Sequence, residues 1–421
     1  MILFQLALKS LRNRFFATSL TVISIGLSVA LLLSVERAKR AAEEGFTQTI
    51  SKTDLIVGAR SGPMQLILYT VFNMGSATHN ISYETYEDIR KNPSIEWTVP
   101  YSLGDGHRGF RVVGTTEDFF KHYHYRGDQK VEIEKGRVFR GLWDVVLGAE
   151  VAKKLGYKLG DPIVVAHGVT RGEGIQKHDD KPFEVVGIMS TTGTPLDRSV
   201  YITLKGMEAL HLDWKDGSAP RPDQVISAQS LHEDDIKIHA ITAFFVGAKS
   251  RIETLRLQRS INEYKEEPLL AIIPGVTLSE LWNGLSYVEG VLRIISWMVI
   301  VVGFMAMLIA LTTTLNERRR EMSILRAVGA NTTQIISLLV FESCLLTLLG
   351  LVLGMILSWG LIAILGPWIE NSFGLYLSGS MVTSTEVTYL LITFAGGVLI
   401  GFIPAYRAMA MSLKDGLSVK L

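Results

Sequence analysis

Four long apolar runs constrain this chain more than any other feature of its sequence. The first, residues 15–35, contains no charged residue. At about 1.5 Å per residue, a helix of this length can cross the ~30 Å hydrocarbon core of a membrane. Three further runs lie toward the other end of the chain, at residues 294–315, 335–365 and 387–406. We therefore predict four transmembrane helices.

The first run has an alternative interpretation as the apolar region of a cleaved signal peptide. Such regions are usually about 7 to 15 residues long and end in a small-x-small cleavage site. Here the run is longer and continues into Val35, Glu36 and Arg37. These features favour an uncleaved span.

Positive charges in the short connections predict the orientation of the spans. The net charge of +1, from 42 Lys+Arg against 41 Asp+Glu, conceals an uneven distribution. The cations of the short segments are Lys9, Arg12, Arg14, Arg318, Arg319, Arg320, Arg326, Arg407, Lys414 and Lys420. By contrast, residues 366–386 contain no Lys or Arg and include Glu370 and Glu386. The positive-inside rule then places both termini and the loop after the second span in the cytoplasm.

The expected organisation is an integral membrane protein with four transmembrane α-helices and a large α+β extracytoplasmic domain between the first and second spans. Residues 1–14 form either an interfacial helix or a frayed terminus. The remaining segments are a first span at 15–35, an outer domain at 36–290 with a subdomain at 115–212, a second span at 291–315, a cytoplasmic loop at 316–334, a third span at 335–365, a short outer loop at 366–386, a fourth span at 387–406 and a tail at 407–421.

The outer domain shows short strands rich in β-branched and aromatic residues, with a few helices between them. We expect strands at residues 54–57, 109–113, 163–166, 183–189, 199–203 and 236–246, and helices at 150–155, 206–210 and 251–264. Residues 104–107, GDGH, are predicted to form a hairpin turn. The apolar segment 64–74, MQLILYTVFNM, is either a core element or an exposed flap, and the core interpretation is favoured.

Motifs for catalysis are missing from the sequence. It contains no G-x-x-x-x-G-K-[ST] phosphate loop, no G-x-S-x-G and no H-E-x-x-H. The single cysteine, Cys344, excludes an intrachain disulfide and a thiolate metal cluster. Near-neutral charge argues against a nucleic-acid binder. We therefore expect no enzymatic activity and no cofactor in this chain.

The nine histidines are a weaker signal, because all of them fall between the first and second spans. His122 and His124 would share a face in an extended segment, and His178 with Asp179 offers nitrogen and oxygen donors suited to zinc. Scattered surface histidines are the alternative, and we favour it because no pair has helical i, i+4 spacing.

Three residues of the third span indicate close helix packing. Glu342 is an intramembrane carboxylate, which is expensive against lipid and should face another helix or a cavity. It suits either a proton relay or a structural hydrogen bond, and the structural role is favoured. Gly350 and Gly354 have the small-xxx-small spacing of a close helix contact.

The loop after the second span carries the most specific pattern, NERRREMSILRAVGA at residues 316–330. It resembles the cytoplasmic loop of the MacB/FtsX/LolC-like ABC transporter permeases, whose pattern is close to R-R-R-E-I-G-x-L-R-A-x-G-A. Segments 7–12, 112–115, 145–155 and 183–187 are also similar to that family. Two departures are Leu413, where the family often has proline, and residues 168–181, which look like an insertion.

This resemblance implies a mechanotransmission permease in the bacterial inner membrane, with a periplasmic outer domain and no fused ATPase domain. The coupling residues would be Glu317, Arg318, Arg319, Arg320, Glu321, Leu325, Arg326 and Gly329. The implied partners are two cytoplasmic ABC ATPase subunits that bind ATP and magnesium, a second permease copy or homologue, and a periplasmic or outer-membrane protein.

Three functions stay open at this point. The first is export, efflux or extraction of lipoprotein or lipid, driven by the partner ATPase. The second is FtsX-like signalling to an extracytoplasmic enzyme without any cargo. The third, a periplasmic function linked to zinc, has the least support.

Overall fold

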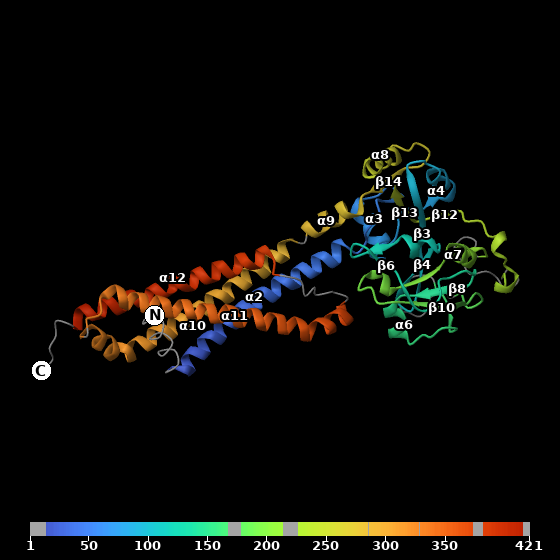
Figure 1. Cartoon of the computed structure of the whole chain (residues 1–421). Coiled ribbons are helices and arrows are strands. Elements are labelled where there is room, and N and C mark those ends of the chain that lie inside the picture. Colours follow the sequence, from blue (N-terminus) through green and yellow to red (C-terminus); the bar gives the residue numbers. More distant parts are fainter. Residues whose placement is uncertain are drawn as a thin grey trace. The chain divides into compact units, whose positions relative to one another are not determined.

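The computed structural model describes residues 14–166, 178–213, 226–284, 286–327, 329–373 and 382–415 (Figure 1). The chain forms two compact units. One comprises Met1–Ala42 and Leu285–Leu421, and the other comprises Glu43–Gly284. The proposed interfacial helix at residues 1–14 lies almost wholly outside the described residues.

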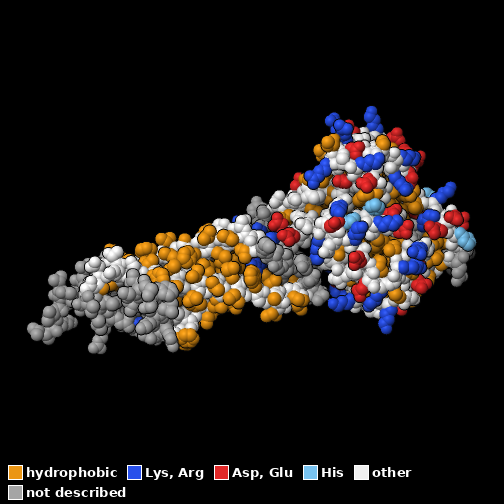
Figure 2. All heavy atoms as spheres, in the orientation of Figure 1, with side chains coloured by type: hydrophobic (Ala, Val, Ile, Leu, Met, Phe, Trp, Pro, Cys, Tyr) orange, Lys and Arg blue, Asp and Glu red, His pale blue; other side chains and the backbone are white. Residues whose placement is uncertain are grey.

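The first unit is a bundle of four long helices that lie side by side in Figure 1. They are α2 (Phe15–Thr47), α10 (Ser286–Ala327), α11 (Thr332–Phe373) and α12 (Ser384–Asp415). Each contains a stretch long and apolar enough to cross a membrane. Large apolar side chains stay exposed along these helices, as Figure 2 shows. Exposed apolar residues suit a lipid environment, so the prediction of four membrane helices is confirmed.

The second unit is an α/β domain that occupies the chain between the first and second spans. Its ten-stranded mixed sheet has the order β14-β1-β13-β3-β4-β11-β8-β10-β7, with β9 paired to β10. The strands are β1 (Leu55–Ala59), β3 (Ile95–His107), β4 (Phe110–Thr115), β7 (Ile133–Gly136), β8 (Asp144–Leu147), β9 (Pro162–Ile163), β10 (Phe183–Met189), β11 (Ser199–Thr203), β13 (Ala243–Ala248) and β14 (Leu269–Ile272).

Two small sheets and several short helices complete this domain. The sheets pair β2 (Ile81–Ser82) with β12 (Ala240–Ile241) and β5 (His124–Tyr125) with β6 (Gln129–Lys130). The helices are α3 (Pro63–Thr70), α4 (Tyr83–Arg90), α5 (Asp118–His122), α6 (Ala149–Leu155), α7 (Leu204–His211), α8 (Arg251–Asn262) and α9 (Pro274–Gly284), with 3-10 turns at Pro195–Arg198, Ala228–Ser230 and Glu233–Asp235.

Both faces of the large sheet are buried. Successive side chains of a strand point to opposite faces, so neighbours should enter different cores. In β4, Val113 belongs to one apolar cluster and Val112 to another. In β8, Val146 lies in the first cluster, whereas Val145 lies in the second. This explains why these strands read as continuous apolar runs.

One prediction for this domain is wrong. Residues 104–107 are not a hairpin turn, because β3 continues through His107. The turn instead has Arg108 and Gly109 at its centre, with φ of 49° and 93°. Positive φ at both central residues is the pattern of a type I′ hairpin turn. A register shift between Leu103 and Gly106 lets the glycine-rich stretch remain in the strand.

The apolar segment at residues 64–74 is a core element, as favoured. It forms most of α3, whose Leu66, Ile67 and Tyr69 are buried in the main apolar cluster. Met64 and Met74 at its two ends are exposed.

The strand predicted at 236–246 is shorter than expected, because regular pairing begins only at Ala240.

Candidate functional site

Glycines allow the first and third membrane helices to approach closely. A Cβ atom added at Gly350 would lie 2.5 Å from Cγ2 of Ile25, and one at Gly354 would lie 2.6 Å from Cβ of Val29. On the opposing helix, a Cβ atom at Gly26 would lie 2.9 Å from Leu353. No side chain fits at such separations, so the two glycines of α11 occupy a tight contact with α2.

Glycines also allow the fourth membrane helix, α12, to pack closely against α11. Added Cβ atoms at Gly397 and Gly401 would collide with Thr347 and Ser343 of α11. The hydroxyls of Thr347 and Ser343 donate hydrogen bonds to carbonyls of their own helix, at 2.7 and 2.8 Å. Polar side chains therefore line this interface without needing water.

Glu342 lies in the interior of the bundle, where the residue is 5% exposed. It precedes Ser343 and belongs to the same stretch of α11 that packs against α12. A carboxylate in this position is shielded from lipid, which is what an intramembrane acid requires.

Sequence reasoning missed a buried ion pair in the bundle. Arg37 of α2 donates two hydrogen bonds to Glu386 of α12, with Nε 2.8 Å from Oε1 and Nη2 3.2 Å from Oε2. Both side chains are almost completely buried, and the Arg37 guanidinium also lies 5.8 Å from the ring centroid of Trp359 in α11. The available signal was that Arg37 follows the first apolar run and Glu386 precedes the fourth, on the same predicted side of the membrane.

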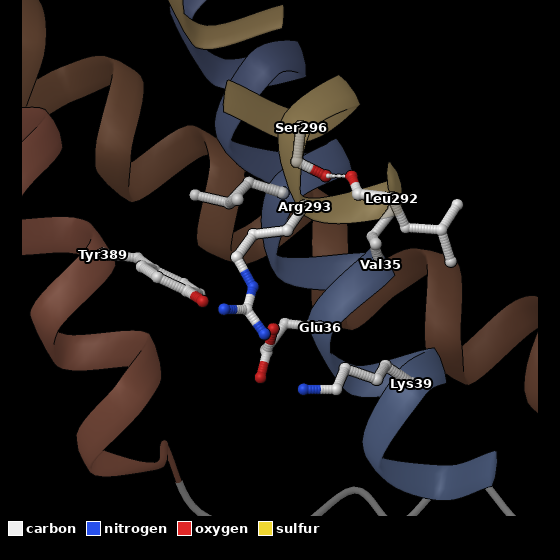
Figure 3. A pocket seen from close by; sticks show the side chains of 8 residues that line it. Val35, Glu36, Lys39, Leu292, Arg293, Ser296 and Tyr389 are labelled. Carbon is white, nitrogen blue, oxygen red and sulfur yellow. Dashed lines mark hydrogen bonds between the residues drawn. The ribbon is translucent and has the colours of Figure 1, made fainter. Parts of the chain in front are cut away.

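A small pocket lies beside this region, between α2, α10 and α12. Its walls include Leu32 and Leu292, and Figure 3 shows Glu36 and Arg293 pointing toward each other from facing helices, with Lys39 and Tyr389 nearby. The pocket volume is about 10 Å³. That is near the minimum for one water molecule, so this pocket cannot hold a transported solute.

The predicted coupling segment is not a loop in the structure. α10 continues without a break from Ser286 to Ala327. The backbone of Glu317, Arg318, Arg319, Arg320, Glu321, Leu325 and Arg326 therefore belongs to the last turns of the second membrane helix, while their side chains lie outside the described part. Gly329 follows with φ of 99°, and α11 begins at Thr332. The chain reverses there because glycine tolerates positive φ.

The four histidine and aspartate residues suggested for a metal do not form one group. His122 stacks on Trp97 with ring centroids 4.7 Å apart, and Nδ1 of His124 lies 2.8 Å from the His122 carbonyl oxygen. Asp179 is exposed. Within the described ranges, the one group of three or more metal-ligating side chains is Asp105, His178 and His211. Only His178 is common to the prediction and the structure.

Two family models together match most of this sequence. The model described as MacB-like periplasmic core domain matches residues 15–250. The model described as FtsX-like permease C-terminal matches residues 293–413, which cover the last three membrane helices and the coupling segment.

Similar curated proteins carry the name macrolide export ATP-binding/permease protein MacB. The protein from Bordetella avium is 23% identical over 98% of this chain and 59% of its own length. The protein from Nitrobacter winogradskyi is 24% identical over 95% of this chain and 58% of its own length. This chain thus spans about three fifths of the length of these two relatives.

A solved structure is also similar, the extracellular domain of the noncanonic ABC-type transporter YknZ from Gram-positive bacteria. It matches 52% of this chain and 99% of its own chain at 12% identity, with a TM-score of 0.32. The family models carry the assignment, one covering the first membrane helix with most of the outer domain and the other covering the last three membrane helices. This chain belongs to the MacB/FtsX-like family of ABC transporter permeases.

Proposed function

We propose that this chain is the permease subunit that couples ATP hydrolysis by a separate cytoplasmic ATPase to conformational work outside the membrane. The observation that carries this proposal is the continuity of α10. One helix includes both the second membrane span and the arginine-rich coupling segment up to Ala327. Because a helix is stiff along its axis, displacement of the coupling segment would be transmitted along the span.

The packing of the bundle supports transmission of motion rather than passage of a solute through it. The contacts of α2 with α11 and of α11 with α12 leave no space for a Cβ atom at their glycines. The pocket among α2, α10 and α12 has room for about one water molecule. Work on a substrate would therefore take place at the outer domain.

The proposed partners are those that the family resemblance implies. Two ATPase subunits would bind ATP and magnesium and receive the coupling segments of two permease chains, identical or homologous. Arg318, Arg319 and Arg320 supply positive charge for an acidic partner surface or anionic lipid. We place both termini in the cytoplasm, the membrane as the bacterial inner membrane, and the α/β domain in the periplasm, where an outer-membrane or periplasmic protein would meet it.

The class of work is export, efflux or extraction of a lipid or lipoprotein. The similar proteins are named for macrolide export. Signalling to an extracytoplasmic enzyme is the second candidate, because the FtsX-like permease model matches the membrane half of the chain.

The test is to purify the chain with a candidate ABC ATPase from the same organism and to measure ATP hydrolysis in lipid nanodiscs. Leu325→Glu and Arg326→Glu place negative charge on the proposed docking segment, and each should lower the ATPase rate at least about tenfold, equivalent to roughly 1.4 kcal/mol in the activation barrier. Lys414→Glu makes the same charge reversal as Arg326→Glu, but in the cytoplasmic tail, and should leave the rate close to wild type. If Leu325→Glu and Arg326→Glu hydrolyse ATP as fast as Lys414→Glu, the docking role is refuted.

A further inference from the structure

Three donor side chains from distant parts of the sequence meet in the α/β domain. Asp105 belongs to β3, His178 precedes β10, and His211 ends α7. Their ligand atoms all lie within 4.8 Å of one another. Nε2 of His211 is 3.3 Å and Nε2 of His178 is 3.8 Å from Oδ2 of Asp105. One carboxylate oxygen therefore faces both imidazoles.

Backbone hydrogen bonds hold two of these residues in place. Gly106, the neighbour of Asp105, exchanges two hydrogen bonds with Ala166, at 2.8 and 2.9 Å. The amide of His178 donates to the carbonyl of Val165 at 2.9 Å. The strand that carries Asp105 and the residue His178 are thus fixed to the same short segment.

The hydrogen bond made by Nδ1 of His211 determines which ring nitrogen carries the proton. Nδ1 lies 3.0 Å from the carbonyl oxygen of Met207, one turn earlier in α7. A carbonyl can only accept, so Nδ1 carries a proton and donates. In the neutral ring, Nε2 then presents its lone pair to Asp105. Histidines that bind metals show this arrangement, with the distal N–H held by a carbonyl or carboxylate.

Exposure and charge at the cluster suit a bound cation. The side chain of His178 is 0% exposed and that of Asp105 is 7% exposed, whereas that of His211 is 38% exposed. The cluster is therefore enclosed on one side and open to solvent beside His211. The nearby cation Lys181 is neutralised by its ion pair with Asp213. Its charge would oppose an incoming metal ion only weakly.

We propose that Asp105, His178 and His211 form a binding site for a divalent metal ion, with zinc as the best-suited ion. Two imidazole nitrogens and one carboxylate oxygen are ligands that zinc accepts, and bonds of about 2.0–2.2 Å place tetrahedral ligands roughly 3.3 Å apart. The observed separations of 3.3 and 3.8 Å are close to that value. A fourth position would be left for water or for a donor group of another molecule.

The site is independent of the ATPase-coupled function proposed above. It implies that the outer domain senses, carries or is stabilised by zinc. The alternative is a metal-free cluster in which a proton lies between the carboxylate and an imidazole. The two interpretations differ in a measurable way, because only the first requires stoichiometric zinc.

The experiment uses the full chain in detergent, stripped with a chelator and then titrated with Zn²⁺ alone. We expect one zinc per chain by mass spectrometry of metals, and d–d absorption typical of tetrahedral coordination when Co²⁺ replaces Zn²⁺. Asp105→Asn, His178→Gln and His211→Gln should each raise the Kd for zinc at least about tenfold.

The matched control is His239→Gln. His239 is 72% exposed and lies 2.7 Å from Glu208, so it forms a histidine–carboxylate pair outside the three-ligand group. Its substitution should leave zinc binding unchanged. His211→Gln tests the site even if His178→Gln fails to fold, because His211 is the most exposed of the three ligands. Absence of stoichiometric zinc in the wild type, or wild-type binding by both Asp105→Asn and His211→Gln, would overturn the proposal.

Discussion

Arg37 and Glu386 join the first and last membrane helices through a buried, two-point ion pair, although they lie 349 positions apart in the chain. With Trp359 against the guanidinium, three helices meet at this place. A buried pair of this kind adds little net stability compared with apolar residues, but loss of one partner leaves a charge without compensation. We infer that the pair contributes to the choice of which helices pack together.

The first prediction follows from the difference between losing one partner of the ion pair and replacing both. Glu386→Leu or Arg37→Met alone should destabilise the bundle by about 3–5 kcal/mol, because each leaves a buried charge behind. The double variant Arg37→Met/Glu386→Leu should recover most of this loss. Thermal unfolding of the full chain in detergent measures the effect. Additive losses in the double variant would show that the two residues act separately.

The second prediction concerns the tight contact between α2 and α11. Gly350→Ala would place a methyl group 2.5 Å from Ile25, so we expect destabilisation by about 1–3 kcal/mol. Gly360→Ala on the same helix is the matched control, because nothing lies within 4 Å of its added Cβ atom. Alanine favours helix more than glycine by up to about 1 kcal/mol, so Gly360→Ala should be neutral or stabilising. The same sign for both variants would contradict the packing argument.

The third prediction concerns the acid stability of the outer domain. Asp144 accepts hydrogen bonds at a single oxygen from Nη1 of Arg137 at 2.6 Å and from the backbone amides of Arg140 and Gly141 at 2.9 Å. Partial burial raises the pKa of Asp144, but the bonds from Arg137 and the two amides outweigh it and lower the pKa below its ordinary value of 3.8. The folded state therefore binds this proton less readily than the unfolded state.

The sign of the pH effect follows from that shift. The contribution of Asp144 to stability is complete above pH 3.8 and is lost as the pH falls through the lower pKa of the folded state. Asp144→Asn should cost about 1–2 kcal/mol near neutral pH and should reduce the loss of stability on acidification. Asp128→Asn, which breaks an exposed pair with Lys52, should change little. Thermal unfolding between pH 3 and 7 measures both variants.

The four spans could be predicted from the sequence because a membrane helix is determined locally. Its length must match the hydrocarbon core, and each apolar residue contributes wherever the helix packs. The strands at Phe183–Met189 and Ser199–Thr203 were predicted with the correct ends for a similar reason, since runs of β-branched residues are bounded by turns. The coupling segment was recognised from its pattern, but its helical continuity with the second span was not.

The contacts between distant residues were decided by the tertiary structure alone. The local pattern of residues 104–107 predicts a turn at Asp105, whereas pairing of its neighbours Leu103 and Gly106 with β4 keeps it in β3, where it lies beside His178 and His211. Local sequence carries no information about which distant segments will pair in a mixed sheet. The sequence by itself determined the membrane helices and the family, because apolar length and a contiguous motif are local properties. Only the tertiary structure decided that Arg37 pairs with Glu386 and that two histidines lie beside one aspartate, because these contacts depend on packing across the whole chain.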